Sequence, residues 1–149
     1  MERLRVLHIS TFDCGGAGTA AYRVHKGLLD SGAHSQFFTL YKKSNGIQVI
    51  PFFNRTISNF IYRAVNKIRE IIISAKGKFY FYGAWQNVVD DISKIDMETV
   101  DSPNVIMLHW ISGFTSLEVI LQLKKKYNAK VYWYLMDMAP MTGGCHFAW

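Results

Sequence analysis

The pattern that most constrains the fold is an apolar run, a cluster of glycines and a helical stripe at the start of the chain. Residues 4–10, LRVLHIS, predict a buried strand, and residues 18–32 place apolar side chains on one helical face and end in glycine. Residues 34–43 then alternate into a second strand. Strand, helix and strand in this order form a βαβ unit, whose right-handed crossover predicts a parallel sheet covered by helices.

The same alternation returns near the other end of the chain. Residues 104–110 predict a strand, residues 115–129 a helix and residues 130–137 another strand. A chain of 149 residues, half of them hydrophobic, is long enough for one core and short for two. We therefore predict one α/β domain over residues 1–149, with a Rossmann-like parallel sheet flanked by helices.

Charge, cysteine content and apolar runs indicate which partners and which cell compartment suit the chain. The net charge of +6 and an aromatic content of 15% suit a negatively charged partner. The two cysteines, Cys14 and Cys145, form no disulfide framework and suit a reducing cytoplasm. The sequence shows neither a secretory leader nor a run of about 18 apolar residues that would span a membrane. These features predict a cytoplasmic protein.

A long basic amphipathic helix is predicted at residues 54–79, with Arg55, Arg63 and Arg69 on or near its polar side. Two interpretations stay open. Its apolar side can pack on the sheet while the arginines face water, which is the commoner outcome for such a stripe. Alternatively, the arginines can face an anionic membrane surface, which would make the protein peripheral on the inner face of the cell membrane.

Polar residues gather where the predicted strands end. His109 and Trp110 close one apolar run and Asp137 closes another, while a glycine cluster follows the first strand. Ligands of open parallel sheets bind at this carboxyl edge. Either polar residue alone fits a capping or loop hydrogen bond equally well, but together they favour a site.

The glycine cluster has its own interpretation as a nucleotide-binding turn. Gly16, Gly18 and Ala21 fit G-x-G-x-x-A, and a helix that starts there aims its N–H groups at a phosphate. NAD is disfavoured, because the second strand ends in lysines where an acidic residue would bind the ribose. NADP stays open, since Lys42 and Lys43 suit a 2′-phosphate.

Three stretches together resemble a known family: VLHISTFDCGGAGTAAYRVHKGLLDSG, VIMLHWISGFTSLEVILQL and VYWYLMDMAPMTGGCHFAW. They are similar to the N-terminal half of GT-B-type retaining glycosyltransferases of the large family numbered four, closest to members that build bacterial surface polysaccharides. The resemblance implies a two-domain enzyme that moves a sugar from a nucleotide sugar to a saccharide or lipid-linked acceptor. The N-terminal domain mainly binds the acceptor.

The resemblance also assigns the residues. It implies that Gly15, Gly16 and Gly18 form a loop near the donor diphosphate and the acceptor, and that His109 and Asp137 are catalytic residues on the acceptor side. The other residues implied at the site are Trp110, Thr142, Gly143, Gly144 and His146. The family usually reads His-Asp-Met where this chain has Met136, Asp137 and Met138. That departure suggests a different sugar or weakened activity.

Several further expectations follow from the resemblance. The donor-binding domain is expected outside this chain, so residues 1–149 alone are expected to be inactive. No metal or other cofactor is expected, and nucleic acid is the least supported partner. Two alternatives remain: an NADP-binding domain of an oxidoreductase, and a non-catalytic binding module.

Overall fold

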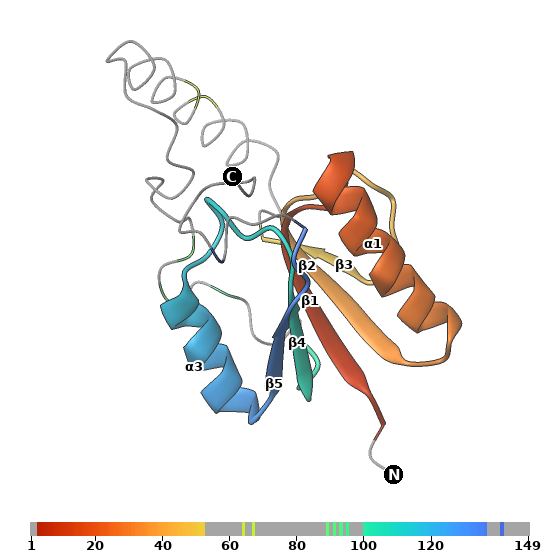
Figure 1. Cartoon of the computed structure of the whole chain (residues 1–149), viewed down its shortest axis with the longest axis vertical. Coiled ribbons are helices and arrows are strands. Elements are labelled where there is room, and N and C mark those ends of the chain that lie inside the picture. The colour runs from red at the N-terminus through yellow and green to blue at the C-terminus, as the bar shows by residue number, and fades with distance from the viewer. Residues whose placement is uncertain are drawn as a thin grey trace.

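The described part of the chain forms a parallel α/β sheet. The computed structural model describes residues 3–52, 64, 67, 89, 91, 93, 95, 100–136 and 141 (Figure 1). The predicted basic helix at 54–79, including Arg55, Arg63 and Arg69, lies outside these residues except for two positions. Asp137, Thr142, Gly143, Gly144 and His146 also lie outside them.

Among the described residues, five parallel strands make up the sheet, in the order β3-β2-β1-β4-β5. Their bounds are β1 Arg5–Phe12, β2 His34–Tyr41, β3 Val49–Pro51, β4 Val105–Leu108 and β5 Lys130–Trp133. The chain moves from β1 outward to β3, then returns to the other side of β1 for β4 and β5. This reversal is the doubly wound arrangement that the alternating sequence pattern predicts, and it confirms the Rossmann-like fold class.

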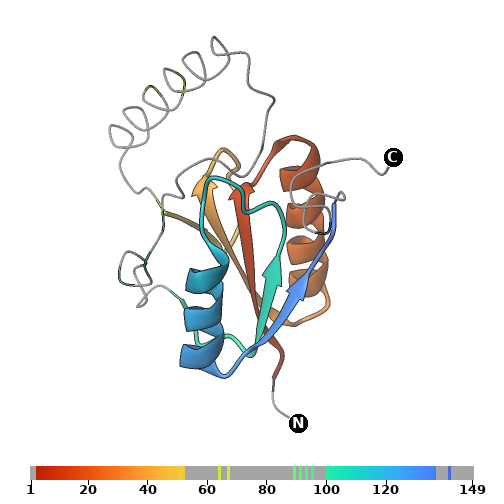
Figure 2. The ribbon, with the colours of Figure 1, turned by 60° about the vertical axis from the view of Figure 1, so that its left-hand side comes forward.

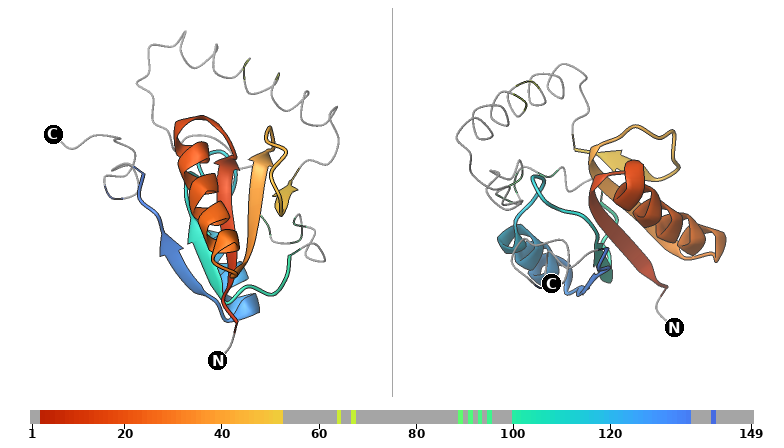
Figure 3. Two further views of the ribbon diagram at one scale, coloured as in Figure 1. Left: turned by 90° about the vertical axis from the view of Figure 1, so that its right-hand side faces the viewer. Right: turned by 45° about the horizontal axis from the view of Figure 1, so that its top comes forward.

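Two described helices cover opposite faces of the sheet. Figures 2 and 3 show α1 (Gly15–Asp30) on one side and α3 (Leu117–Tyr127) on the other. Gly32 ends α1 with a φ of +83°, and the amide of the next residue donates to the carbonyl of Leu28 at 3.0 Å. The Ser116 side chain begins α3 by accepting from the Val119 amide at 3.4 Å.

Side chains alternate between the two faces of β1, and both faces are buried. Leu7 and Ile9 pack with Ile106, Leu108 and residues of α3 in the main apolar cluster. On the other face, His8 meets His25 of α1 beside Phe37. The side covered by α1 thus holds buried imidazoles where the side covered by α3 holds apolar groups.

Several element bounds differ from the sequence-based expectation. Strand β5 ends at Trp133 where a strand was predicted over residues 130–137, and β4 ends at Leu108 where one was predicted over residues 104–110. Helix α1 begins at Gly15, three residues before the predicted start at residue 18, so Gly15, Gly16 and Gly18 lie in its first turn instead of in a loop. The short strand β3 was not predicted, because three residues ending in proline carry too little pattern to detect.

Candidate functional site at the carboxyl edge of the sheet

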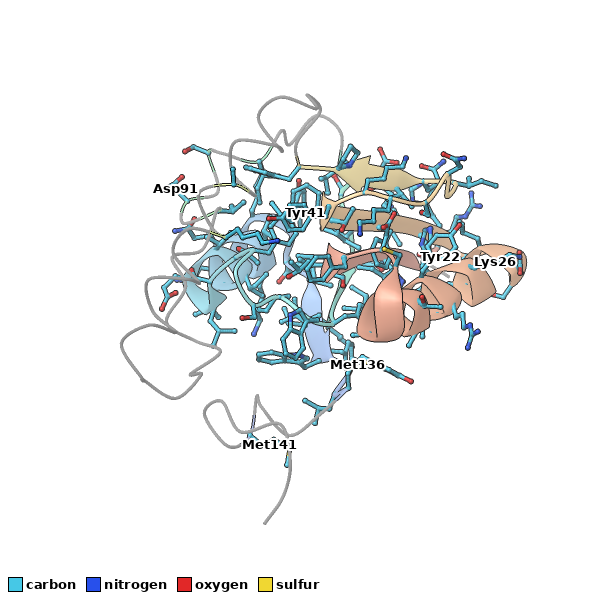
Figure 4. The ribbon with its side chains drawn as sticks, turned by 90° about the horizontal axis from the view of Figure 1, so that it is seen from above. Tyr22, Lys26, Tyr41, Asp91, Met136 and Met141 are labelled. Atoms are coloured by element: carbon cyan, nitrogen blue, oxygen red, sulfur yellow. The ribbon has the colours of Figure 1, made fainter. Side chains whose placement is uncertain are left out.

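Hydrogen bonds join the carboxyl ends of β1 and β5 to the segment that follows β4. The Thr11 amide and hydroxyl both donate to the carbonyl of Trp110, at 2.6 and 3.0 Å. The Trp133 indole N–H donates to the carbonyl of His109 at 3.0 Å. Figure 4 looks onto this edge, with Met136 after the end of β5 and Tyr22 on α1. The fold therefore brings the strand-end residues His109 and Trp110 next to the end of β1.

The first turn of α1 opens at the same edge. Its N-cap residue, Cys14, makes no side-chain capping bond, and the first turn contains no acidic residue. Gly15 has a φ of +78°, which glycine adopts without strain. A Cβ added to Gly16 would meet nothing within 4 Å. Gly16 therefore has open space beside it and no packing reason to be glycine.

Gly18 has a different role. A Cβ at this position would lie 2.8 Å from the carbonyl oxygen of Phe12 and 3.1 Å from the carbonyl carbon of Asp13. Gly18 is buried, and its lack of a side chain lets α1 pack directly on the end of β1. The three glycines thus separate into a turn position, an open position and a packing position.

Asp13, between β1 and α1, anchors the segment that follows β2. Its buried carboxylate accepts from the amide of Lys43 at 2.9 Å, and from the amide and hydroxyl of Ser44 at 2.9 and 2.7 Å. The hydroxyl of Ser44 in turn accepts from the Gly46 amide at 3.2 Å. Asp13 thereby holds residues 43–46 beside the start of α1.

Replacing Asp13 with Ala should lower the free energy of unfolding by about 2–4 kcal/mol, since each hydrogen bond to a charged acceptor contributes about 1.5–3 kcal/mol and the freed loop donors regain water. Urea denaturation followed by circular dichroism measures this loss. Asp13→Asn keeps an acceptor of the same shape and should lose clearly less. An Asp13→Ala variant as stable as the unmodified chain would show that the three contacts to the carboxylate stabilise nothing.

His109 lies directly after β4 and is 2% exposed. Its Nε2 lies 2.9 Å from Nδ1 of His8, and the two rings stack with centroids 5.2 Å apart. Burial lowers the pKa of His109 to about 4. The pKa of His8 falls to about 3, mainly through burial and further through the neighbouring His109 and His25. Both rings are therefore neutral at pH 7.

Two residues escaped the sequence analysis, Asp13 at this edge and His8 in the middle of β1. Asp13 sits between a strand and a glycine cluster, and a charged residue at such a position is a signal that could have been followed. His8 interrupts an otherwise apolar strand at a position that alternates onto a buried face, which is costly for a polar ring without a partner.

Metal ligands and membrane-spanning helices can be searched for only among the described residues. Within residues 3–52, 100–136 and the described positions between and after them, no three His, Cys, Asp or Glu side chains gather as a metal site. Over the same residues, every helix falls short of the length and apolarity needed to cross a bilayer.

Compared with known proteins, the chain matches no family model, no curated protein and no solved structure.

Proposed function

We propose that this chain is the acceptor-side domain of a glycosyltransferase that uses a nucleotide sugar. The observation that carries the proposal is the convergence at one edge of the sheet: an uncapped helix start with an open glycine, beside the strand-end residues His109 and Trp110. A helix N-terminus attracts anionic oxygens, and a buried polar ring at the same edge of the sheet offers a directional contact. A sugar carrying a phosphate at its reacting carbon presents both kinds of group.

The NADP alternative has weaker support. It needs cationic side chains after β2 for the 2′-phosphate, and the sequence offers Lys42 and Lys43. The ammonium group of Lys42 donates instead to the carbonyl of Val49 at 3.0 Å. In addition, the packing of α1 on β1 already requires glycine at position 18. The presence of Gly18 is therefore explained without a bound pyrophosphate.

The finer parts of the proposal rest on the sequence. Three further calls stay predictions: catalysis by Asp137, membrane contact through residues 54–79, and contacts from Thr142, Gly143, Gly144 and His146. Apart from positions 64 and 67, these residues lie outside the described part of the chain.

The sharpest test uses Gly16. We expect saturation-transfer NMR to detect binding of nucleotide sugars or oligosaccharides to the 149-residue chain, and Gly16→Val to weaken that binding at least about tenfold, or about 1.4 kcal/mol, because a side chain there would occupy the open space. Gly27→Val is the matched control. Gly27 lies on the same helix, is exposed and also has nothing within 4 Å of an added Cβ.

Two outcomes would overturn the proposal. One is tight binding of NADPH with no response to any sugar compound. The other is sugar binding that survives Gly16→Val unchanged, which would separate the ligand from the start of α1.

A further inference from the structure

A row of stacked rings crosses the sheet on the side covered by α1. The ring of His8 stacks on Phe37 with centroids 6.0 Å apart and on His109 with centroids 5.2 Å apart. One hydrogen bond joins the two imidazoles, between Nδ1 of His8 and Nε2 of His109 at 2.9 Å. The other nitrogen of each ring is buried and has no hydrogen-bond partner among the described residues.

A single proton lies between the two rings, and its position fixes both tautomers. Burial keeps both histidines neutral at pH 7, so each ring carries one proton. If His8 donates, then His109 must carry its own proton on Nδ1. If His109 donates, then His8 must carry its proton on Nε2. The two arrangements differ in which ring is left with an unpartnered N–H.

His25 of α1 does not supply a hydrogen bond to the unpartnered Nε2 of His8. The carbonyl of Ile47 can only accept, so the Nε2 of His25, 3.0 Å away, carries the proton of that ring. The Nδ1 of His25 then accepts from the hydroxyl of Ser35 at 2.8 Å. Both nitrogens of His25 are therefore occupied, and it has no N–H to offer to Nε2 of His8.

The surroundings of the two rings decide between the arrangements. His8 sits in the middle of the central strand, 0% exposed, between Phe37, His25 and His109. His109 follows the last residue of β4 at the open edge, where the ring of Tyr134 lies 5.6 Å away and Tyr134 is 45% exposed. A buried N–H without a partner is rarer than a buried acceptor without one, so the proton belongs on the ring that a ligand or water can reach.

We infer that His8 donates from Nδ1 to Nε2 of His109, and so holds His109 in the tautomer that presents an N–H from Nδ1 to an oxygen of the bound ligand. His8 is a positioning residue, and it acts only through His109. The inference rests on the proposed function for the identity of the ligand. The ligand atom that meets His109 is an acceptor, such as a hydroxyl, ring or phosphate oxygen, and His109 is not a base toward it.

The ring of Tyr134 lies beside the ring of His109 at this edge. The His109 ring is covered in this structure, and the half-exposed Tyr134 ring packs against it at the edge. Because Tyr134 is already 45% exposed, its ring can turn toward solvent and uncover this side of His109.

Long-range proton–nitrogen NMR correlation on histidine-labelled protein at pH 7 tests the inference directly. We expect His109 to show a protonated Nδ1 and a bare Nε2, His8 to show a protonated Nδ1, and His25 to show the opposite tautomer as an internal reference. A His109 ring that carries its proton on Nε2 would overturn the inference. This measurement needs only the unmodified chain.

Two variants of His8 separate its positioning role from packing. His8→Asn keeps an amide N–H close to where Nδ1 stands, so His109 should remain protonated on Nδ1. His8→Phe keeps a ring on Phe37 but removes the donor, so we expect His109 to shift toward a mixture of tautomers while backbone amide spectra stay native. An unchanged His109 in folded His8→Phe would contradict the role of His8, and if that variant fails to fold, the unmodified spectrum still decides.

A ligand titration shows whether the tautomer assignment or the proposed function fails. Nucleotide sugars or oligosaccharides should shift the Nδ1 and Hδ1 signals of His109 while the His25 signals stay fixed. If only NADPH shifts them, the proposed function fails and the tautomer assignment stands. If sugars bind but His109 proves protonated on Nε2, the inference fails and the proposed function stands.

Discussion

Replacing Gly18 with Ala should lower the free energy of unfolding by about 2–3 kcal/mol, and Gly18→Val should lower it further or prevent folding. The added Cβ would lie 2.8 Å from the carbonyl oxygen of Phe12 and 3.0 Å from its carbon. These are backbone atoms at the end of the central strand, so they cannot rotate away as a side chain could. Thermal or urea denaturation measures the loss.

Gly16→Ala is the matched control for Gly18. It adds the same methyl group two residues earlier in the same helix, where nothing lies within 4 Å. We expect Gly16→Ala to leave stability unchanged or raise it by up to about 1 kcal/mol, because alanine loses less backbone entropy in a helix. Similar stability in the two variants would show that α1 does not pack on β1 as described.

Lowering the pH from 6.5 to 4.5 should destabilise the protein steeply, because its buried histidines resist protonation. The pKa of His8 falls to about 3 and that of His109 to about 4, both mainly through burial, from 6.5 in the unfolded chain. In this pH range the unfolded state binds more protons than the folded state. Stability is thus fully present above 6.5 and falls as the pH drops toward 4, at about 1.4 kcal/mol per pH unit for each histidine.

Urea denaturation at several pH values tests this slope. Most carboxylates titrate near or below the lower end of this window, so the histidines dominate the slope in its upper part. His8→Phe should be less stable at pH 7, yet it should show a shallower dependence on pH, because one of the two rings no longer titrates. A flat profile of the unmodified chain between pH 6.5 and 4.5 would rule out the neutral stacked pair.

The sequence predicted the fold well because its signals are local. Residues 4–10 and 34–43 alternate or run apolar within single strands, and the Gly32 stop ends α1 within two residues of its observed last residue. The start of α1 was missed because three glycines in four residues carry no helical preference of their own. The early start of the helix is stabilised by packing of Gly18 on β1, which is a tertiary contact.

The candidate site was predictable only in outline. His109 stood out because it ends an apolar run, and the structure places it at the expected edge. Its partner His8 lies 101 residues away in sequence, and Asp13 holds amides about 30 residues further along the chain. Such pairings depend on strand order and register, which a periodic pattern does not encode.

The edge strand β5 favours self-association of the protein in concentrated solution. Tyr132, Trp133, Tyr134 and Leu135 are all more than a third exposed, on or just after β5, which ends the described sheet order. An edge strand bearing consecutive apolar residues is a template for self-association through its unpaired backbone groups. A charged residue at Tyr132, whose side chain is 53% exposed, would oppose that pairing and offers a simple way to keep concentrated samples monodisperse for the NMR experiments.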